Sequence, residues 1–222
     1  TNEIKDLELL LLIKNSSFVN NISNRQGGAL YISNMNQVVI IECRFIHNSG
    51  KIGGAVKIAN IVSVTFNRCT FIFNSGNYGG GLSLSKIQKS FKKINCLFLK
   101  NNAKRGNDIS MRNPGYLHKT NKFMMINSSF IGGVNLPVSS LSLHYVSSVI
   151  MINNSFMGYG IYSKQGTISL IHCTSIRMRM VKFTANKGSA IHVTKGRYFE
   201  STKCSFINTY FQPFSGTLSV SD

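Results

Sequence analysis

Phenylalanine recurs along this chain at a nearly constant interval, and this repeat restricts the possible folds more than any other feature. The recurring positions are Phe18, Phe45, Phe71, Phe98, Phe130, Phe156, Phe183 and Phe206. Their successive separations are 27, 26, 27, 32, 26, 27 and 23 residues. A constant period of roughly 20–50 residues is typical of repeat architectures, in which each unit packs against its neighbours.

Other residue types recur at constant offsets from these phenylalanines. Three residues after the Phe, the sequence places a column of asparagines: Asn21, Asn48, Asn74 and Asn101. Two residues before it stands a small residue, which in three successive units is a cysteine: Cys43, Cys69 and Cys96. A glycine pair follows eight or nine residues after the Phe, as in Gly27-Gly28, Gly53-Gly54 and Gly79-Gly80.

The segments between the glycines alternate with a period of two and favour strands. A unit of about 26 residues with short strands and Gly/Asn/Ser turns predicts an all-β fold, a right-handed parallel β-helix of about eight coils. Inward Phe rings then form a ladder, Asn amides hydrogen-bond between coils, and the cysteines form a buried thiol ladder. Strict alternation places Ile41, Ile94, Ile126 and Ile152 on the inner face with the Phe. It also turns Arg179 inward unless the chain bends between Met180 and Val181.

The repeat also predicts the domain organisation. We expect residues 1–13 to form an N-terminal edge or cap strand, 14–213 the β-helix, and 214–222 the C-terminal tail of a longer chain. The separation of 32 indicates an inserted loop near 111–122, where Asn113-Pro114-Gly115 is a turn signal. The longest aliphatic run, Leu9 to Ile13, is far shorter than the roughly 20 residues of a transmembrane helix, so none is predicted.

Within residues 15–109 the repeat resembles a known family. Phe45-Ile46-His47-Asn48 followed by Gly53-Gly54-Ala55-Val56 is similar to the paired Phe-x-x-Asn and Gly-Gly-Ala-(Ile/Leu/Val) motifs of chlamydial polymorphic outer-membrane proteins. Phe18 to Leu30 and Phe71 to Leu82 have the same pairing, the latter with Gly in place of Ala. Residues 110–180 match only through the Phe positions. The resemblance implies a β-helical surface protein with an adhesive role.

The chain is strongly basic, with 25 Lys and Arg against 7 Asp and Glu and a formal net charge of +18. Such a charge attracts polyanions. Candidate anion-binding residues are Lys89, Lys92, Lys93, Lys104, Arg105, Arg112, Lys119, Arg177 and Arg179. Tyr78, Tyr116, Tyr145 and Tyr159 are the rings left for the surface. Expected partners are other protein subunits or cell-surface glycans, with a polyanion possible through the basic surface.

The sequence favours a non-catalytic role. The body of the chain keeps only Glu42, Asp108 and Glu200, which the repeat places in different coils, so the paired carboxylates of a glycoside hydrolase are not expected. No cofactor or metal is expected either, because the five histidines and five cysteines show no ligand spacing. Lys- or Arg-based elimination on a polysaccharide remains an alternative, as does a structural subunit docked through its basic surface to acidic protein, glycan or nucleic acid.

Three Asn-x-Ser/Thr sequons stand three residues before a repeat Phe, where the side chain points outward. These glycosylation candidates are Asn15, Asn127 and Asn153. Together with the resemblance they predict a rigid structural or adhesive module at the cell surface or outside the cell.

Overall fold

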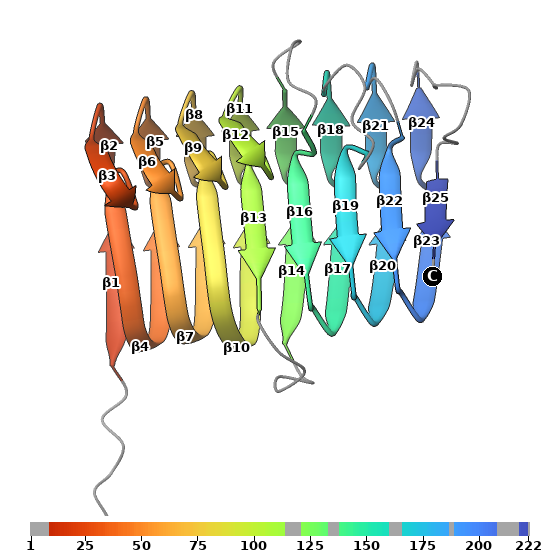
Figure 1. Ribbon diagram of the computed structural model, residues 1–222, viewed down its shortest axis with the longest axis horizontal. Coiled ribbons are helices and arrows are strands. Elements are labelled where there is room, and N and C mark those ends of the chain that lie inside the picture. Colours follow the sequence, from red (N-terminus) through yellow and green to blue (C-terminus); the bar gives the residue numbers. More distant parts are fainter. Residues whose placement is uncertain are drawn as a thin grey trace, which may run out of the picture.

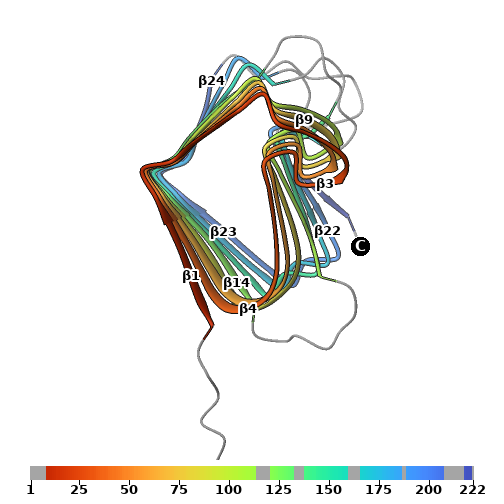
Figure 2. The same cartoon turned by 90° about the vertical axis from the view of Figure 1, so that its left-hand side faces the viewer.

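The computed structural model describes residues 9–113, 121–132, 138–159, 166–186 and 189–207, and the backbone of 218–221. All regular structure in these residues is β-strand, stacked into a parallel β-helix of about seven turns (Figure 1). Seen from the N-terminal end, the chain passes clockwise as it recedes, which makes the helix right-handed (Figure 2). The predicted fold class is therefore confirmed.

Three parallel sheets form the walls of the helix. The sheet that carries the repeat phenylalanines contains β2 (Ser17–Val19), β5 (Arg44–Ile46), β8 (Thr70–Ile72), β11 (Leu97–Leu99), β15 (Ser129–Ile131), β18 (Ser155–Met157), β21 (Lys182–Thr184) and β24 (Ser205–Ile207). A small sheet contains β3 (Ile22–Gln26), β6 (Ser49–Ile52), β9 (Ser75–Tyr78) and β12 (Asn102–Arg105).

The third and largest sheet covers two faces of the helix, because three long strands bend from one face to the other. These long strands are β4 (Leu30–Ile41), β7 (Val56–Asn67) and β10 (Leu82–Ile94). In later coils separate strands form the first face: β13 (Ile109–Arg112), β16 (Leu141–His144), β19 (Ile168–Ile171), β22 (Ile191–Thr194) and β25 (Leu218–Ser221). The second face holds β1 (Leu10–Lys14), β14 (Lys122–Ile126), β17 (Ser148–Ile152), β20 (Ser175–Arg179) and β23 (Tyr198–Thr202).

Strands near both ends of the chain pair with strands of the β-helix. Strand β1, which begins within the segment predicted as an edge or cap strand, pairs in parallel with the second half of β4. Strand β25, within the segment predicted as a tail, pairs with β22. The expected loop at 111–122 begins with the last residues of β13 and ends at the start of β14, and residues 114–120 between them lie outside the described part of the chain.

At the corner before each Phe strand, the structure departs from the predicted alternation of inward and outward side chains. The residue three before the Phe has a left-handed backbone at all eight of these corners, at Asn15, Glu42, Arg68, Asn95, Asn127, Asn153, Met180 and Lys203. This residue interrupts the alternation, so Ile40 and Cys43 both face inward while Ile41 is only partly buried. The prediction that Ile41, Ile94, Ile126 and Ile152 share the Phe face is therefore wrong. The same corner at Met180 leaves Arg179 exposed and Val181 buried.

The repeat phenylalanines stack into one continuous column inside the helix. Ring centroids of successive Phe lie 4.5–5.3 Å apart, with interplanar angles of 2–14°. The six inner rings, Phe45 to Phe183, are fully buried. The pairing distance between parallel strands, about 4.8 Å, sets this spacing, because the strands that carry the rings pair in register.

The asparagine column forms a saturated hydrogen-bond ladder beside the rings. Asn74 Oδ1 accepts from the backbone N–H of Asn48 at 2.9 Å and from its Nδ2 at 3.0 Å. Asn74 Nδ2 donates to the Phe45 carbonyl and to Asn101 Oδ1, both at 2.9 Å. Asn21 Nδ2 donates to Asn48 Oδ1 at 2.9 Å, which starts the ladder. Each inner amide thus bonds the corner of the preceding coil and the amide of the following one.

The column before the Phe holds Cys43, Cys69 and Cys96 as free, buried thiols. Each Sγ lies 3.2–3.3 Å from the carbonyl oxygen two residues earlier. These cysteines therefore pack as small side chains that also satisfy a corner carbonyl.

The glycine pair permits the close return of the chain between the small sheet and the long strands. Gly53 has φ +72°, and a Cβ at Gly54 would lie 2.1 Å from the Gly80 carbonyl oxygen. Only glycine fits there, because backbone atoms of the next coil occupy that space.

Removal of one ladder amide tests its contribution to stability. We expect Asn74→Ala to lower the free energy of unfolding by about 3 kcal/mol, because it removes the buried acceptor of the Asn48 N–H and Nδ2 and one donor to the Phe45 carbonyl. The control is Asn60→Gly, since Asn60 makes its inter-coil bond to Asn34 at the exposed surface and glycine tolerates its left-handed backbone. Urea unfolding of both variants measures the difference, and equal losses would contradict the proposed role of the buried ladder.

Candidate functional site: a basic groove

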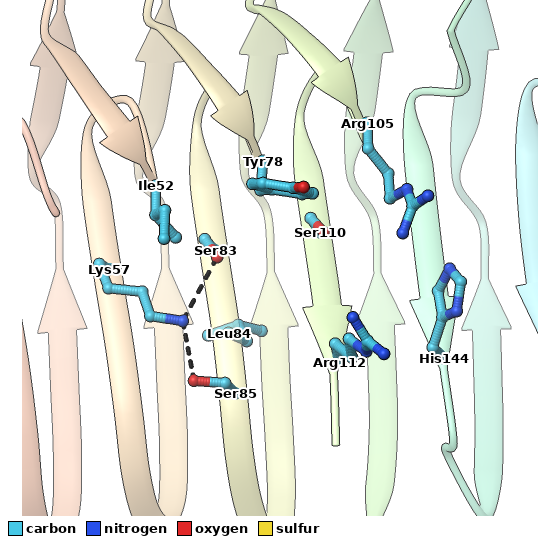
Figure 3. A pocket seen from close by; sticks show the side chains of 10 residues that line it. All are labelled: Ile52, Lys57, Tyr78, Ser83, Leu84, Ser85, Arg105, Ser110, Arg112 and His144. Carbon is cyan, nitrogen blue, oxygen red and sulfur yellow. Dashed lines mark hydrogen bonds between the residues drawn. The ribbon is translucent and has the colours of Figure 1, made fainter. Parts of the chain in front are cut away.

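A groove of about 320 Å³ lies on the outer surface of the first face, beside the ends of the small-sheet strands (Figure 3). Its floor is formed by side chains of β7, β10, β13 and β16, namely Lys57, Ser83, Ser85, Ser110, Arg112 and His144. Its wall is formed by the last residues of β6, β9 and β12, namely Ile52, Tyr78 and Arg105.

The floor consists of two columns that strand register creates. In β7 the side chains of Val56 and Ile58 enter the core, so Lys57 between them points outward. Register pairing continues this column from Lys57 through Ser83 and Ser110 to Ser142. The second column passes from Ala59 through Ser85 and Arg112 to His144 by the same pairings.

Lys57 lies at one end of the groove with its ammonium group above the next coil. Its Nζ donates to Ser85 Oγ at 2.8 Å and lies 3.5 Å from Ser83 Oγ (Figure 3). The residue is only 7% exposed, and this burial lowers the pKa of the ammonium to about 8. An ammonium has three N–H donors, so one remains for a ligand in the groove.

Arg105, Arg112 and His144 gather at the other end. Burial, followed by the positive charges of Arg105 and Arg112 and by His172, lowers the pKa of His144 to about 4. The imidazole is therefore neutral at pH 7, and its Nε2 lies 3.2 Å from Ser142 Oγ. Two guanidinium groups and a neutral imidazole give this end several N–H donors for an anion.

The ten residues that line the groove include no aspartate or glutamate. The three cations are therefore not neutralised within the groove. A concave surface with one sign of charge attracts ligands of the opposite sign, so the site suits an anionic ligand.

The structure brings only two of the predicted anion-binding residues, Arg105 and Arg112, into the groove. Lys89, Lys92 and Lys104 are exposed but do not line it. Arg177 and Arg179 are exposed on β20, where Arg177 pairs with Glu200 at 3.5 Å. Lys119 lies outside the described residues.

The assignment of Lys93 to an anion-binding surface is wrong, because the side chain is fully buried inside the helix. Its Nζ lies 3.7 Å from the Phe130 ring centroid and 4.4 Å from that of Phe98. No hydrogen-bond partner for it exists among the described residues. Burial lowers the pKa of Lys93 to about 7, while the nearby Cys96 and Asp108 act in the opposite direction.

Asp108 is the second buried ionisable group of this region. Its Oδ1 accepts from Asn101 Nδ2 at 2.9 Å, and its Oδ2 accepts from Ser140 Oγ at 2.8 Å and from the Tyr159 hydroxyl. Burial raises the pKa of Asp108 to about 6 despite these bonds. Tyr159, expected at the surface, is instead buried and donates this bond, whereas Tyr78 is exposed and forms part of the groove wall.

The three sequon asparagines, Asn15, Asn127 and Asn153, are exposed at the left-handed corners. Asn153 Nδ2 donates to Asn127 Oδ1 at 3.0 Å across adjacent coils. Their amides are therefore open to solvent, as a glycan acceptor requires.

Sequence reasoning missed Lys57 and His144 as site residues, and it expected Tyr78 at the surface without assigning it to a site. The repeat does contain a signal for the first, because Lys57, Ser83 and Ser110 each stand two residues after a Gly-Gly-Ala-type triplet. His144 stands at the same offset from Phe130 as Arg112 does from Phe98, so the repeat places both in one column, but nothing in the residue type marks it as part of a site. Tyr78 is recognised as part of a site only once the wall is seen.

The described residues contain no cluster of three His, Cys, Asp or Glu side chains that could hold a metal ion. They also contain no helix that is long and apolar enough to span a bilayer. No protein-family model matches the chain, and a search of curated proteins finds no match.

The buried charge of Lys93 gives a pH-dependent prediction. Between pH 7 and pH 9 the unfolded chain keeps this ammonium protonated while the folded chain loses the proton, so the stability contribution of Lys93 rises with pH. We expect Lys93→Met to be more stable than the original chain at pH 7, and this advantage to shrink by roughly 2 kcal/mol by pH 9. Met occupies the same inward column at Met125 and Met151.

Lys92→Met is the matched control for this experiment, because Lys92 is the exposed neighbour on the same strand. Urea unfolding of the three chains at several pH values provides the measurement. Parallel pH profiles for Lys93→Met and the original chain would show that the ammonium is not buried in the folded state.

Proposed function

We propose that this chain is a non-catalytic β-helical scaffold that binds an acidic glycan through its basic groove, at the cell surface or outside the cell. The observation that carries the proposal is the groove itself, in which Lys57, Arg105 and Arg112 face a common space that contains no carboxylate. The stacked coils keep these side chains at constant spacing, so the site is preorganised and little conformational entropy is lost on binding.

Two further features support this proposal. The Phe-x-x-Asn and Gly-Gly-Ala motifs resemble those of chlamydial polymorphic outer-membrane proteins, and the resemblance implies a surface-displayed adhesive module. The exposed sequons are compatible with passage through a secretory route.

A binding role also agrees with where the acids lie. Glu42 pairs with Arg68 at an exposed corner, Glu200 pairs with Arg177, and Asp108 is buried. None of the three lines the groove, so carboxylate-based hydrolysis has no acid or base there.

Binding of defined oligosaccharides tests this function. By isothermal titration calorimetry we expect a uronate-bearing oligosaccharide to bind and a neutral one of equal length not to bind, with affinity falling as salt is added. Arg105→Gln/Arg112→Gln should weaken binding by at least about tenfold, because two charged hydrogen-bond donors are lost.

The matched control is Lys92→Gln/Arg179→Gln, which removes the same charge from exposed residues that do not line the groove. Equal weakening by both double variants would mean that net charge alone attracts the glycan. Shortening of the oligosaccharide during incubation would replace the binding role with an enzymatic one.

Anion binding should also change the ionisation of His144. A carboxylate or sulfate near Arg105 and Arg112 offsets their positive charge, so we expect the low pKa of His144 to rise by at least one unit when the oligosaccharide binds. Histidine NMR titration with and without the ligand measures this change. His47, which stacks on Phe73 outside the groove, serves as the internal reference, and an unchanged His144 would place the anion elsewhere.

A further inference from the structure

The cations of the groove form two separate clusters along the rod axis. The Lys57 ammonium lies over β10, where it donates to Ser85, whereas Arg105 and Arg112 reach toward His144 of β16 (Figure 3). Strand β13 lies between β10 and β16. Two strand spacings correspond to about 10 Å along the axis. Arg105 and His144 join Arg112, so one cluster offers an ammonium and the other offers two guanidinium groups and an imidazole (Figure 3).

Neutral groups occupy the space between these clusters. Ser83 and Ser110 supply hydroxyls on the floor, and Tyr78 supplies the ring on the wall (Figure 3). The Ser column continues beyond the groove through Ser142 to Ser169, whose hydroxyl is buried and has no partner among the described residues. Hydroxyls that both donate and accept, beside an aromatic face, match the hydroxyls and the C–H faces of sugar rings.

A sugar residue in an extended chain advances by nearly the distance between paired strands, about 4.8 Å. A chain parallel to the rod axis therefore places successive residues over successive coils. Two cation clusters two coils apart then meet the first and third residues of a bound stretch.

We propose that the groove binds an extended polysaccharide along the rod axis, with an anionic group on every second residue. One anion binds at Lys57 and the next at Arg105, Arg112 and His144, while the intervening residue lies over Ser110 against Tyr78. This inference rests on the proposed function and adds to it the direction and the charge spacing of the ligand.

A nucleic acid fits the groove less well. Single-stranded nucleic acids bind where successive bases stack on several aromatic rings. Tyr78 is the one phenyl-type ring among the ten lining residues.

The experiment compares ligands with one and two charges. The probes are a tetrasaccharide in which uronic acid alternates with a neutral amino sugar, its disaccharide with one carboxylate, and a neutral tetrasaccharide. For the charged tetrasaccharide we expect Lys57→Met and Arg112→Gln each to weaken binding about tenfold, and the double variant about a hundredfold, since the sites are far enough apart to be additive. For the disaccharide only one of the two substitutions should weaken binding, because a single carboxylate occupies one cluster.

Two further variants keep the test decisive. Lys92→Met is the charge-matched control and should leave every affinity unchanged. Ser110→Asp places a carboxylate on the floor near the Arg cluster and should weaken tetrasaccharide binding more than tenfold, even if Lys57→Met fails to fold as judged by circular dichroism.

The outcomes distinguish failure of this inference from failure of the proposed glycan-binding function. If the tetrasaccharide binds but Lys57→Met leaves its affinity unchanged, a single anion site exists and the spacing inference is wrong, while the binding function stands. If the neutral tetrasaccharide binds equally well, or if no oligosaccharide binds, both proposals are wrong. Tighter binding of a single-stranded oligonucleotide than of the charged tetrasaccharide would overturn the assignment to a polysaccharide.

Discussion

Register pairing of parallel strands between successive coils is the constraint on which this structure depends. Each residue in a strand lies beside its equivalent in the next coil, at the pairing distance of the backbone. Side chains that fit this distance are stabilised as columns, and the aligned phenyl rings and the asparagine amides are two such columns. A residue type that cannot stack would have to leave the column or find another partner, so the repeat in the sequence follows from the geometry of the backbone.

The same register organises the outer surface, where it has consequences for function. An inward residue on either side forces Lys57 to the outside, and pairing places Ser83 and Ser110 in line with it. Because the coils do not move independently, the distance between the backbones of Lys57 and Arg112 is determined by two strand spacings, and the bond to Ser85 holds the ammonium over the next coil. A solenoid can thus keep charges at defined intervals for a linear ligand, using side chains that are far apart in sequence.

Departures from the repeat show how the interior accommodates exceptions. Gly81 replaces the alanine of its column because a Cβ there would lie 3.0 Å from the Phe98 ring. One coil later the same column contains Asp108, which is tolerated because Asn101, Ser140 and Tyr159 donate hydrogen bonds to its carboxyl. Lys93 stands in a column of Ile40, Phe66 and Met125, and the faces of Phe98 and Phe130 partly compensate its ammonium. Two buried ionisable groups in adjacent parts of the core make this region the electrostatically strained part of the helix.

The sequence by itself determined the β-helix, the Phe, Asn and Cys columns, and a basic surface, because a period of about 26 residues constrains every coil in the same way. Alternation along a strand could not predict which side chains cross to the other face at a corner. The left-handed residue there, as at Glu42, changes the parity, and half of these corner residues are not asparagine. For the same reason Lys93 was wrongly placed outside. Only the tertiary structure brought Lys57, Tyr78, Arg105, Arg112 and His144 together, because their proximity depends on strand register and on the close return at Gly54, which act between coils rather than along the chain.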